Sequence, residues 1–173
     1  YNHIKENLLP SHIADVEDVE NAKEFIGKNI WLNDILSDSI FMSQSRPSLK
    51  KFQKVNVVGV KIYQNSSFDC PIWLEIDLKN DFKSYIRYNG KFRFFSRQNN
   101  YFIKYPIKKS WDKTIIKKIM EGNIEYGMNY EQVRASIGNP DIINNTSSRH
   151  GVSQQWIYGN NISNKRYLVF ENG

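Results

Sequence analysis

The segment from Glu125 to Pro140, "EYGMNYEQVRASIGNP", constrains the fold more than any other part of this sequence. Asn129 is typical of a helix N-cap, because its side-chain oxygen can accept hydrogen bonds from the free N–H groups of the first turn. Gln132, three residues later, completes the pattern of a capping box. Gly138 can adopt the left-handed conformation that ends a helix, and Pro140 lacks the N–H needed to continue it. The segment therefore predicts a short helix between Asn129 and Gly138.

The apolar residues of this segment predict which face of the helix is buried. Tyr130, Val133 and Ile137 recur at helical spacing and form one stripe. Met128, just before the cap, can pack on Val133 as a hydrophobic staple. No acid, base or nucleophile stands at a spacing that would make the charged residues of the helix catalytic. The segment therefore encodes folding rather than chemistry.

The residues on either side predict a helix before this segment and two strands after it. The earlier helix is expected to begin at Ser110 and to end near Gly122. A polar loop, "DIINNTSSRHG", is followed by "SQQWIYG" and "KRYLVFENG", two short runs rich in aromatic and β-branched residues. The expected core packs both helices against this sheet and comprises Trp111, Ile115, Ile119, Val133, Ile137, Trp156 and Tyr158.

This order of helix, loop, strand and strand resembles the SmpA/OmlA family, the BamE-like outer-membrane lipoproteins of the β-barrel assembly machinery. The residues that carry the resemblance are Gly127-Met128, Gln132-Val133, Gly138, Pro140, Trp156-x-Tyr158 and Phe170-x-x-Gly173. It covers about Gly122 to Gly173. β-Lactamase inhibitor proteins share the same unit of two helices and a small sheet. The resemblance implies an α+β domain that binds a surface and identifies no single partner.

Charge is distributed unevenly along the 173 residues and suggests three parts. Residues 1–27 contain two Lys and six acidic residues, whereas residues 28–120 contain eighteen Lys or Arg and seven acidic residues. Pro106 would interrupt strand pairing near the end of the basic part. We therefore predict an acidic N-terminal segment with a helix (1–27), a basic β-rich domain (28–108) and an α+β domain (109–173).

The basic part reads as a series of short strands. Five runs have the composition of strands: "NIWL", "KVNVVGVKIY", "PIWLEIDL", "FKSYIRY" and "FRFF". Ile72, Leu74 and Ile76 fall on one face of the third run and Trp73 on the other, which is the alternation of a half-buried strand. We expect a small SH3-like barrel with "SDSIFMSQSRPSLKKF" as a long loop between early strands. The predicted fold class of the whole chain is α+β.

The stretch from Tyr85 to Lys109, "YIRYNGKFRFFSRQNNYFIKYPIKK", is the part of the sequence that best fits a ligand-binding face. It interleaves eight aromatic rings with five candidate ligand-binding cations, Arg87, Lys91, Arg93, Arg97 and Lys104. Such mixing suits nucleic acid, because cations attract phosphates and rings stack on bases. It equally suits an anionic membrane surface or a glycan. The structural alternative is a barrel hairpin with Asn89-Gly90 as its tight turn, although both faces of that hairpin would carry rings.

The sequence contains no motif for catalysis or for binding a metal or cofactor. His3, His12 and His150 are the only histidines, and Cys70 is the only cysteine, which excludes an internal disulfide. Motifs for phosphate binding, serine hydrolysis and zinc hydrolysis are missing. No run of apolar residues is long enough to span a bilayer. We therefore expect no enzymatic activity, no metal, no cofactor and no transmembrane segment in this sequence.

Two hypotheses of function remain. The first is a non-catalytic, extracytoplasmic interaction protein of the bacterial cell envelope, in one version a lipoprotein, that binds an envelope protein or an anionic lipid surface. A first residue other than Met, Tyr1, is what removal of a signal peptide would leave. The second is a cytoplasmic nucleic-acid-binding barrel that uses residues 85–109. Because the stretch contains no RNA-binding motif, we expect nucleic acid to be the less favoured partner.

Overall fold

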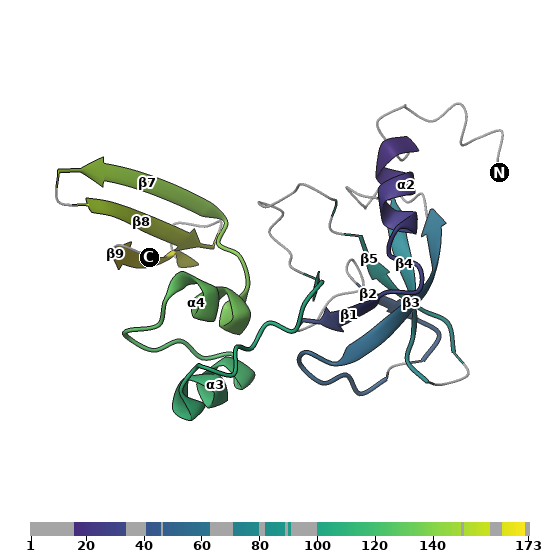
Figure 1. Ribbon diagram of the computed structural model, residues 1–173. Coiled ribbons are helices and arrows are strands. Elements are labelled where there is room, and N and C mark those ends of the chain that lie inside the picture. Colours follow the sequence, from purple (N-terminus) through teal and green to yellow (C-terminus); the bar gives the residue numbers. More distant parts are fainter. Residues whose placement is uncertain are drawn as a thin grey trace. The chain divides into compact units, whose positions relative to one another are not determined.

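The protein divides into two compact α+β units. The structure, a computed structural model, describes residues 16–33, 41–45, 47–62, 71–79, 82–88, 90, 100–149, 151–159 and 164–171. Unit 1 comprises the described residues up to 90 together with 100–106, and unit 2 those from 107 onward. In the described residues, unit 1 has one helix, unit 2 has two, and each unit has its own antiparallel sheet (Figure 1). The predicted α+β class is confirmed, and the predicted domain boundaries stay a prediction.

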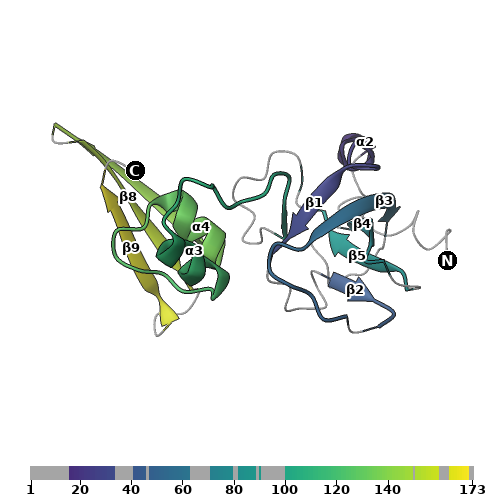
Figure 2. The same cartoon turned by 60° about the horizontal axis from the view of Figure 1, so that its bottom comes forward.

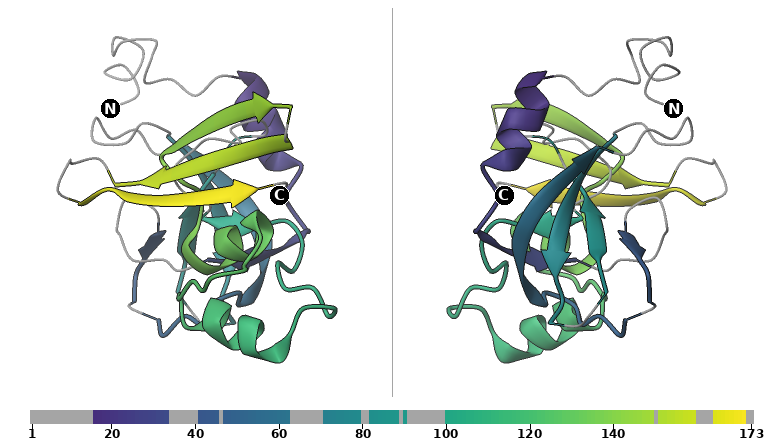
Figure 3. Two further views of the ribbon diagram at one scale, coloured as in Figure 1. Left: turned by 90° about the vertical axis from the view of Figure 1, so that its left-hand side faces the viewer. Right: turned by 90° about the vertical axis from the view of Figure 1, so that its right-hand side faces the viewer.

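Unit 1 is a curled antiparallel sheet with one helix, α2 (Val16–Lys23). The described strands follow the order β2-β5-β4-β3-β1-β6 across the sheet. They are β1 (Asn29–Leu32), β2 (Phe41–Ser43), β3 (Lys54–Ile62), β4 (Ile72–Asp77), β5 (Ser84–Arg87) and β6 (Tyr101–Phe102). Figure 3 shows the blue and teal strands of this sheet bending strongly along their length. A β-bulge between Val57 and Gly59 interrupts the pairing of β3 with β4, and such bulges increase local twist.

The predicted alternation of β4 is correct on one face and wrong on the other. Ile72, Leu74 and Ile76 are buried in the core, as predicted. Trp73, which the alternation places on the solvent side, is 0% exposed. Its cross-strand partners are Lys61 and Arg87, and the aliphatic stems of long basic side chains cover apolar surface. The outer face of β4 is therefore covered at this position.

A ring just after α2 packs against the core of the curled sheet. Phe25 stands edge-on to Tyr88, with centroids 5.9 Å apart, and edge-on to Tyr101, at 5.8 Å. Both tyrosines are almost fully buried. The Asn100 side-chain amide donates to the main-chain oxygen of Arg87 at 3.1 Å and so joins the start of β6 to the end of β5. Two rings of the predicted ligand-binding stretch thus belong to the core.

The strand pairing of β5 contradicts two predictions. Ile86 pairs with Leu74 of β4 on one side and with Phe41 of β2 on the other. The predicted hairpin around Asn89-Gly90 is wrong along Ile86, because both edges of that residue are already paired, and its second arm lies outside the described residues. The predicted long loop over residues 37–52 is also wrong, because it contains β2. The fifth predicted strand, "FRFF", lies outside the described residues.

Unit 2 contains two helices and a sheet with the strand order β7-β8-β9. Its elements are α3 (Lys113–Met120), α4 (Tyr130–Ile137), β7 (Ile142–Ser148), β8 (Gly151–Tyr158) and β9 (Arg166–Glu171). In Figure 2 both helices lie beside the same face of this sheet. The polar loop predicted for residues 141–151 is wrong for most of its length, because β7 pairs with β8 from end to end. Backbone pairing holds this polar segment in the sheet without an apolar stripe of its own.

The capping box of α4 is confirmed. The Asn129 side chain accepts from the Gln132 N–H at 3.0 Å, and the Gln132 side chain accepts from the Asn129 N–H at 2.9 Å. Met128 and Val133, the predicted staple, are both buried. Gly138 has a positive φ of 85°, but its ψ of −169° places it outside the predicted left-handed helical region. That combination is open essentially to glycine alone, so the need for glycine is stricter than predicted.

Replacing Asn129 by alanine is expected to cost about 0.5 to 2 kcal/mol of stability, because the Gln132 N–H in the first turn of α4 loses its acceptor. Urea denaturation of each variant measures this loss. Asn129→Asp is the matched control, since aspartate also caps helices and should preserve most of the stability. An unchanged midpoint for the alanine variant would show that the box contributes nothing to folding.

The start of α3 differs from the prediction. Asp112 rather than Ser110 caps the helix, and its carboxylate accepts from the Thr114 N–H at 2.7 Å. The Thr114 hydroxyl and backbone N–H groups hold the pKa of Asp112 below its usual value. Trp111 therefore precedes the helix and is not part of its apolar stripe. The end is as predicted, because Gly122 follows the helix with a φ of 70°.

The core of unit 2 lies where α4 meets the sheet. Trp156 is 1% exposed. The centroid of its ring lies 4.8 Å from that of Phe170 and 5.4 Å from the Arg134 guanidinium. Ile119 and Val133 are buried as predicted. The remaining members of the predicted core, Ile115, Ile137 and Tyr158 as well as Trp111, are only half-buried.

Candidate functional site

Two of the five predicted ligand-binding cations lie among the described residues. Arg87 ends β5 and is half-buried beside Trp73, whereas Lys104 is exposed just beyond β6. Lys91, Arg93 and Arg97 lie outside the described residues. Arg87 is therefore partly a packing residue, and Lys104 is the one of these two that faces solvent. The binding role of all five stays a prediction.

Around Lys104, strand register assembles a surface that the linear sequence does not show. Trp31 of β1 pairs with Lys54 of β3 on one side and with Phe102 of β6 on the other. Residues directly opposite each other in an antiparallel sheet place their side chains on the same face. Ile30 and Leu32, which flank Trp31 in β1, are fully buried. The row Lys54, Trp31, Phe102 therefore lies on the outer face of the sheet.

Two further rings join this row. The Phe52 ring stands edge-on to Phe102 at 5.7 Å and to Tyr105 at 6.3 Å, and the Tyr105 ring is 6.4 Å from Trp31. Phe52 has a φ of 57°, which is uncommon for a residue with a bulky side chain. Backbone strain of this kind is tolerated where surrounding contacts fix the conformation, and it recurs at functional sites. The Phe52 N–H donates to the Leu32 oxygen at 2.7 Å and holds the turn in place.

Two lysines lie against these rings. The Lys51 ammonium is 5.4 Å from the centroid of Phe52, and the Lys54 ammonium is 5.9 Å from that of Trp31. Cations at such distances are attracted to the ring faces. We call the group formed by Trp31, Lys51, Phe52, Lys54, Phe102 and Tyr105 the basic ring cluster.

The segment that leaves the cluster adds exposed apolar side chains. Ile103 is 64% exposed and Tyr105 is 53% exposed, and Lys104 stands between them. An aliphatic side chain, a tyrosine and a lysine in succession suit an interface between water and lipid, where the apolar groups insert and the ammonium meets a head group. The same surface is less suited to stacking on bases, because Phe52 is 5% exposed and the Phe102 and Tyr105 rings meet it edge-on.

Sequence reasoning missed most of this cluster. Its members come from three segments of the chain, around residues 31, 51–54 and 102–105, and only the last lies in the predicted stretch. The pairing of Trp31 with Lys54 and Phe102 depends on strand register, which composition does not reveal. The short run "LKKF" (49–52) is the one local signal, and the predicted long loop includes it.

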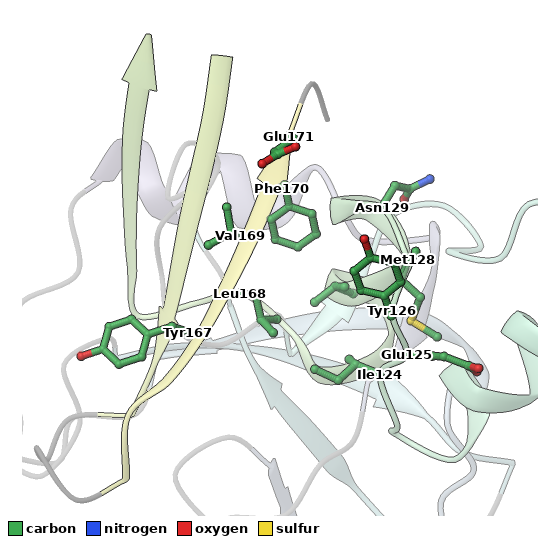
Figure 4. Close-up of a pocket in the computed structure, with 12 residues that line it drawn as sticks. Ile124, Glu125, Tyr126, Met128, Asn129, Tyr167, Leu168, Val169, Phe170 and Glu171 are labelled. Atoms are coloured by element: carbon green, nitrogen blue, oxygen red, sulfur yellow. The ribbon is translucent and has the colours of Figure 1, made fainter. Parts of the chain in front are cut away.

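Unit 2 has a separate groove of about 790 Å³ between β9 and the loop that joins α3 to α4. Figure 4 shows Leu168 and Phe170 pointing from β9 towards Ile124, Tyr126 and Met128 of that loop. Tyr167 and Val169 point to the other side of the strand. Glu125 and Glu171 are also among the lining residues, and strand alternation places the Glu171 side chain on the same side of β9 as Val169. The groove thus has an apolar floor.

The described residues contain no cluster of three or more His, Cys, Asp or Glu side chains placed to hold a metal ion. In the same part of the chain, no helix has the length and apolar character needed to cross a membrane. His3, His12, His150 and Cys70 lie outside the described residues.

The sequence matches no family model, and neither a curated protein nor a solved structure matches it.

Proposed function

We propose that this protein is a non-catalytic interaction protein of the bacterial cell envelope that binds an anionic lipid surface through unit 1. The observation that carries the proposal is the basic ring cluster together with exposed Ile103 and Tyr105. Its lysines supply attraction to anionic head groups, and each Lys near such a surface contributes about 1 kcal/mol. The exposed apolar side chains supply burial in the interface.

The arrangement of each unit agrees with the rest of this proposal. We propose that the curled sheet of unit 1 is an SH3-like barrel. Unit 2 is an SmpA/OmlA-like domain in this proposal, as the sequence resemblance implies. Two helices beside a small antiparallel sheet support the second assignment. The protein is then extracytoplasmic, either periplasmic or held at the outer membrane by a lipid anchor. The gene upstream of Tyr1 tests this location: a signal sequence ending in a lipobox Cys supports it, and a cytoplasmic start near Tyr1 contradicts it.

Charge reversal in the basic ring cluster and at neighbouring Lys104 tests whether this surface binds lipid. In the triple variant Lys51→Glu, Lys54→Glu, Lys104→Glu, affinity for vesicles of phosphatidylglycerol and phosphatidylcholine is expected to fall at least about tenfold, given about 1 kcal/mol per lysine. Sedimentation of protein with vesicles measures this affinity. The melting temperature should change little, because solvated surface charges contribute little to stability.

The matched control reverses the charge at three exposed basic residues of unit 2, Lys113, Lys117 and Arg166, by substitution with Glu. This variant should bind vesicles as tightly as the unchanged protein does. Equal losses of vesicle affinity in the two triple variants would mean that binding depends on the net charge of the protein alone. Single-stranded oligonucleotides at low and moderate salt test the alternative, a nucleic-acid-binding barrel. Tight, salt-sensitive binding to them without vesicle binding would favour that alternative and would contradict the proposal.

A further inference from the structure

β7 is an edge strand of the unit 2 sheet, and it lacks the features that usually protect sheet edges. Among the described residues it pairs with β8 alone, and the left view of Figure 3 shows it at one edge of the three green and yellow strands. It is seven residues long and contains no charged residue and no proline. An edge of this kind is a template for pairing with another strand. The function proposed above does not use it.

The other sheet edges in the described part of the chain differ from β7. The edge strands of unit 1, β2 and β6, are three and two residues long. β9, at the opposite edge of the unit 2 sheet, carries Arg166 and Glu171 at its two ends. Short strands and charged side chains both hinder pairing between edges. β7 is therefore the described edge at which an added strand meets the least resistance.

The middle of β7 is exposed on both faces. Asn144, Asn145, Thr146 and Ser147 are all exposed, although successive side chains of a strand point to opposite faces. Neither face of this stretch is therefore buried within the protein. Backbone pairing with β8 holds it in the sheet. A strand added at the other side would pair the outward-facing N–H and C=O groups of β7 without displacing any packed side chain.

The sequence of β7 is complementary to itself in an antiparallel arrangement. Two copies that pair with Asn145 opposite Asn145 also place Asn144 opposite Thr146. Every side chain of β7 that meets another is then uncharged, so no like charges oppose each other within the strand. A side-chain amide both donates and accepts hydrogen bonds, so the two Asn145 side chains can bond to each other.

Charge at the two ends of β7 favours the same register. Asp141 precedes the strand, Arg149 follows it, and each stands four positions from Asn145. An antiparallel pair centred on Asn145 therefore places Asp141 of each copy opposite Arg149 of the other. The Gly159 N–H donates to Oδ2 of Asp141 at 2.6 Å, and a carboxylate accepts several hydrogen bonds, so Asp141 can receive a guanidinium as well. Registers that place Asp141 or Arg149 opposite its own copy are disfavoured by repulsion.

We propose that this protein self-associates through β7, with β7 of a second copy as the added strand in an antiparallel register centred on Asn145. The sheets of the two copies of unit 2 then form one continuous sheet across a twofold axis. Pairing along a single edge buries less surface than a stable dimer does, so the association is weak and depends on concentration. The edge belongs to unit 2, so this proposal does not depend on lipid binding by unit 1.

Charged substitutions at the axis test this register in the full chain. In Asn145→Lys and in Asn145→Asp like charges face each other, so the dimer dissociation constant should rise at least about threefold in each variant alone. An equimolar mixture of the two variants should associate at least as tightly as the unchanged protein, because Lys then faces Asp. Sedimentation equilibrium measures these constants. Asn123→Lys adds the same charge at an exposed position outside the sheet, and this control should associate as the unchanged protein does.

Disulfide formation between copies gives a second readout. Residues directly opposite each other on antiparallel strands are close enough for a disulfide, so Asn145→Cys with Cys70→Ser should yield a covalent dimer on oxidation. Tyr126→Cys with Cys70→Ser is the control for random collision, because Tyr126 is fully exposed in unit 2. It should cross-link at least about tenfold more slowly, since no pairing holds the two thiols together.

Three results would overturn the proposal. One is protein that stays monomeric up to about 1 mM, and another is a mixture of the Lys and Asp variants that associates no more tightly than either alone. The third is association that both variants leave unchanged, which would place the contact on another surface. Equal cross-linking at positions 145 and 126 would likewise show that the copies meet only by random collision. Circular dichroism should be the same for all variants, because residue 145 is exposed.

Discussion

Replacing Trp156 by alanine is expected to lower the free energy of unfolding of unit 2 by about 3 to 5 kcal/mol, which is typical when a buried tryptophan is truncated. Its ring is 1% exposed and lies 4.8 Å from Phe170 and 6.4 Å from Tyr130, centroid to centroid. Its indole N–H donates to the Gln154 side chain at 3.1 Å. The variant therefore loses apolar burial, ring contacts and a hydrogen bond, and it leaves a cavity between α4 and the sheet.

Guanidinium denaturation followed by circular dichroism measures the loss from Trp156→Ala. Val152→Ala is the matched control, because Val152 lies in the same strand and is 53% exposed. Its expected effect is below about 0.5 kcal/mol, as for surface positions in general. A loss below about 1 kcal/mol for Trp156→Ala would contradict the assignment of Trp156 to the centre of this core.

Replacing Leu74 by alanine is expected to cost unit 1 about 2 to 5 kcal/mol. Leu74 is fully buried in β4, with Val60 opposite it in β3 and Ile86 opposite it in β5. Removing three carbon atoms there, one methine and two methyl groups, leaves a cavity that strands paired on both sides cannot easily close.

Val58→Ala is the control for Leu74→Ala, since Val58 sits at the bulge of β3 and is 49% exposed. The same denaturation experiment reports both variants. Similar small losses for the two would mean that the curled sheet lacks the core described above. A large loss for Leu74→Ala alone is the expected outcome.

The parts of the fold that sequence predicted are those that neighbouring residues determine. The capping box of Asn129 and Gln132 depends on residues three positions apart, and Gly122 and Gly138 act through their own backbone angles. Such signals are complete within one short stretch. The alternation of Ile72, Leu74 and Ile76 is equally local.

The parts that sequence missed depend on pairing between distant segments. β2 is three residues long and is held by β5, more than forty residues further along the chain. β7 carries Asn, Thr and Ser where a predicted strand needs apolar alternation, and its pairing with β8 supplies the backbone hydrogen bonds instead. The amino-acid composition of neither segment predicts a strand from β-propensity.

The candidate site was found only in part for the same reason. Lys104 was predicted from a contiguous stretch, but Trp31, Lys51 and Lys54 reach it through the register of β1 with β3 and β6. Tyr88 and Tyr101, which the same stretch offered as ligand-binding rings, are in the core against Phe25. A stretch of sequence shows which residues are neighbours along the chain. Which residues share a surface depends on which strands are neighbours in the sheet.

The most direct test of lipid binding through unit 1 is to measure where the bound protein meets the bilayer. A spin label is attached at Ile103→Cys, and separately at Val169→Cys in unit 2, each with Cys70→Ser. The two positions are 64% and 62% exposed, so the labels begin in similar surroundings. With phosphatidylglycerol-containing vesicles, the label at 103 should become more accessible to oxygen and less accessible to a water-soluble nickel complex, and the label at 169 should not change. Vesicle-bound protein whose label at 103 keeps its aqueous accessibility would contradict the account.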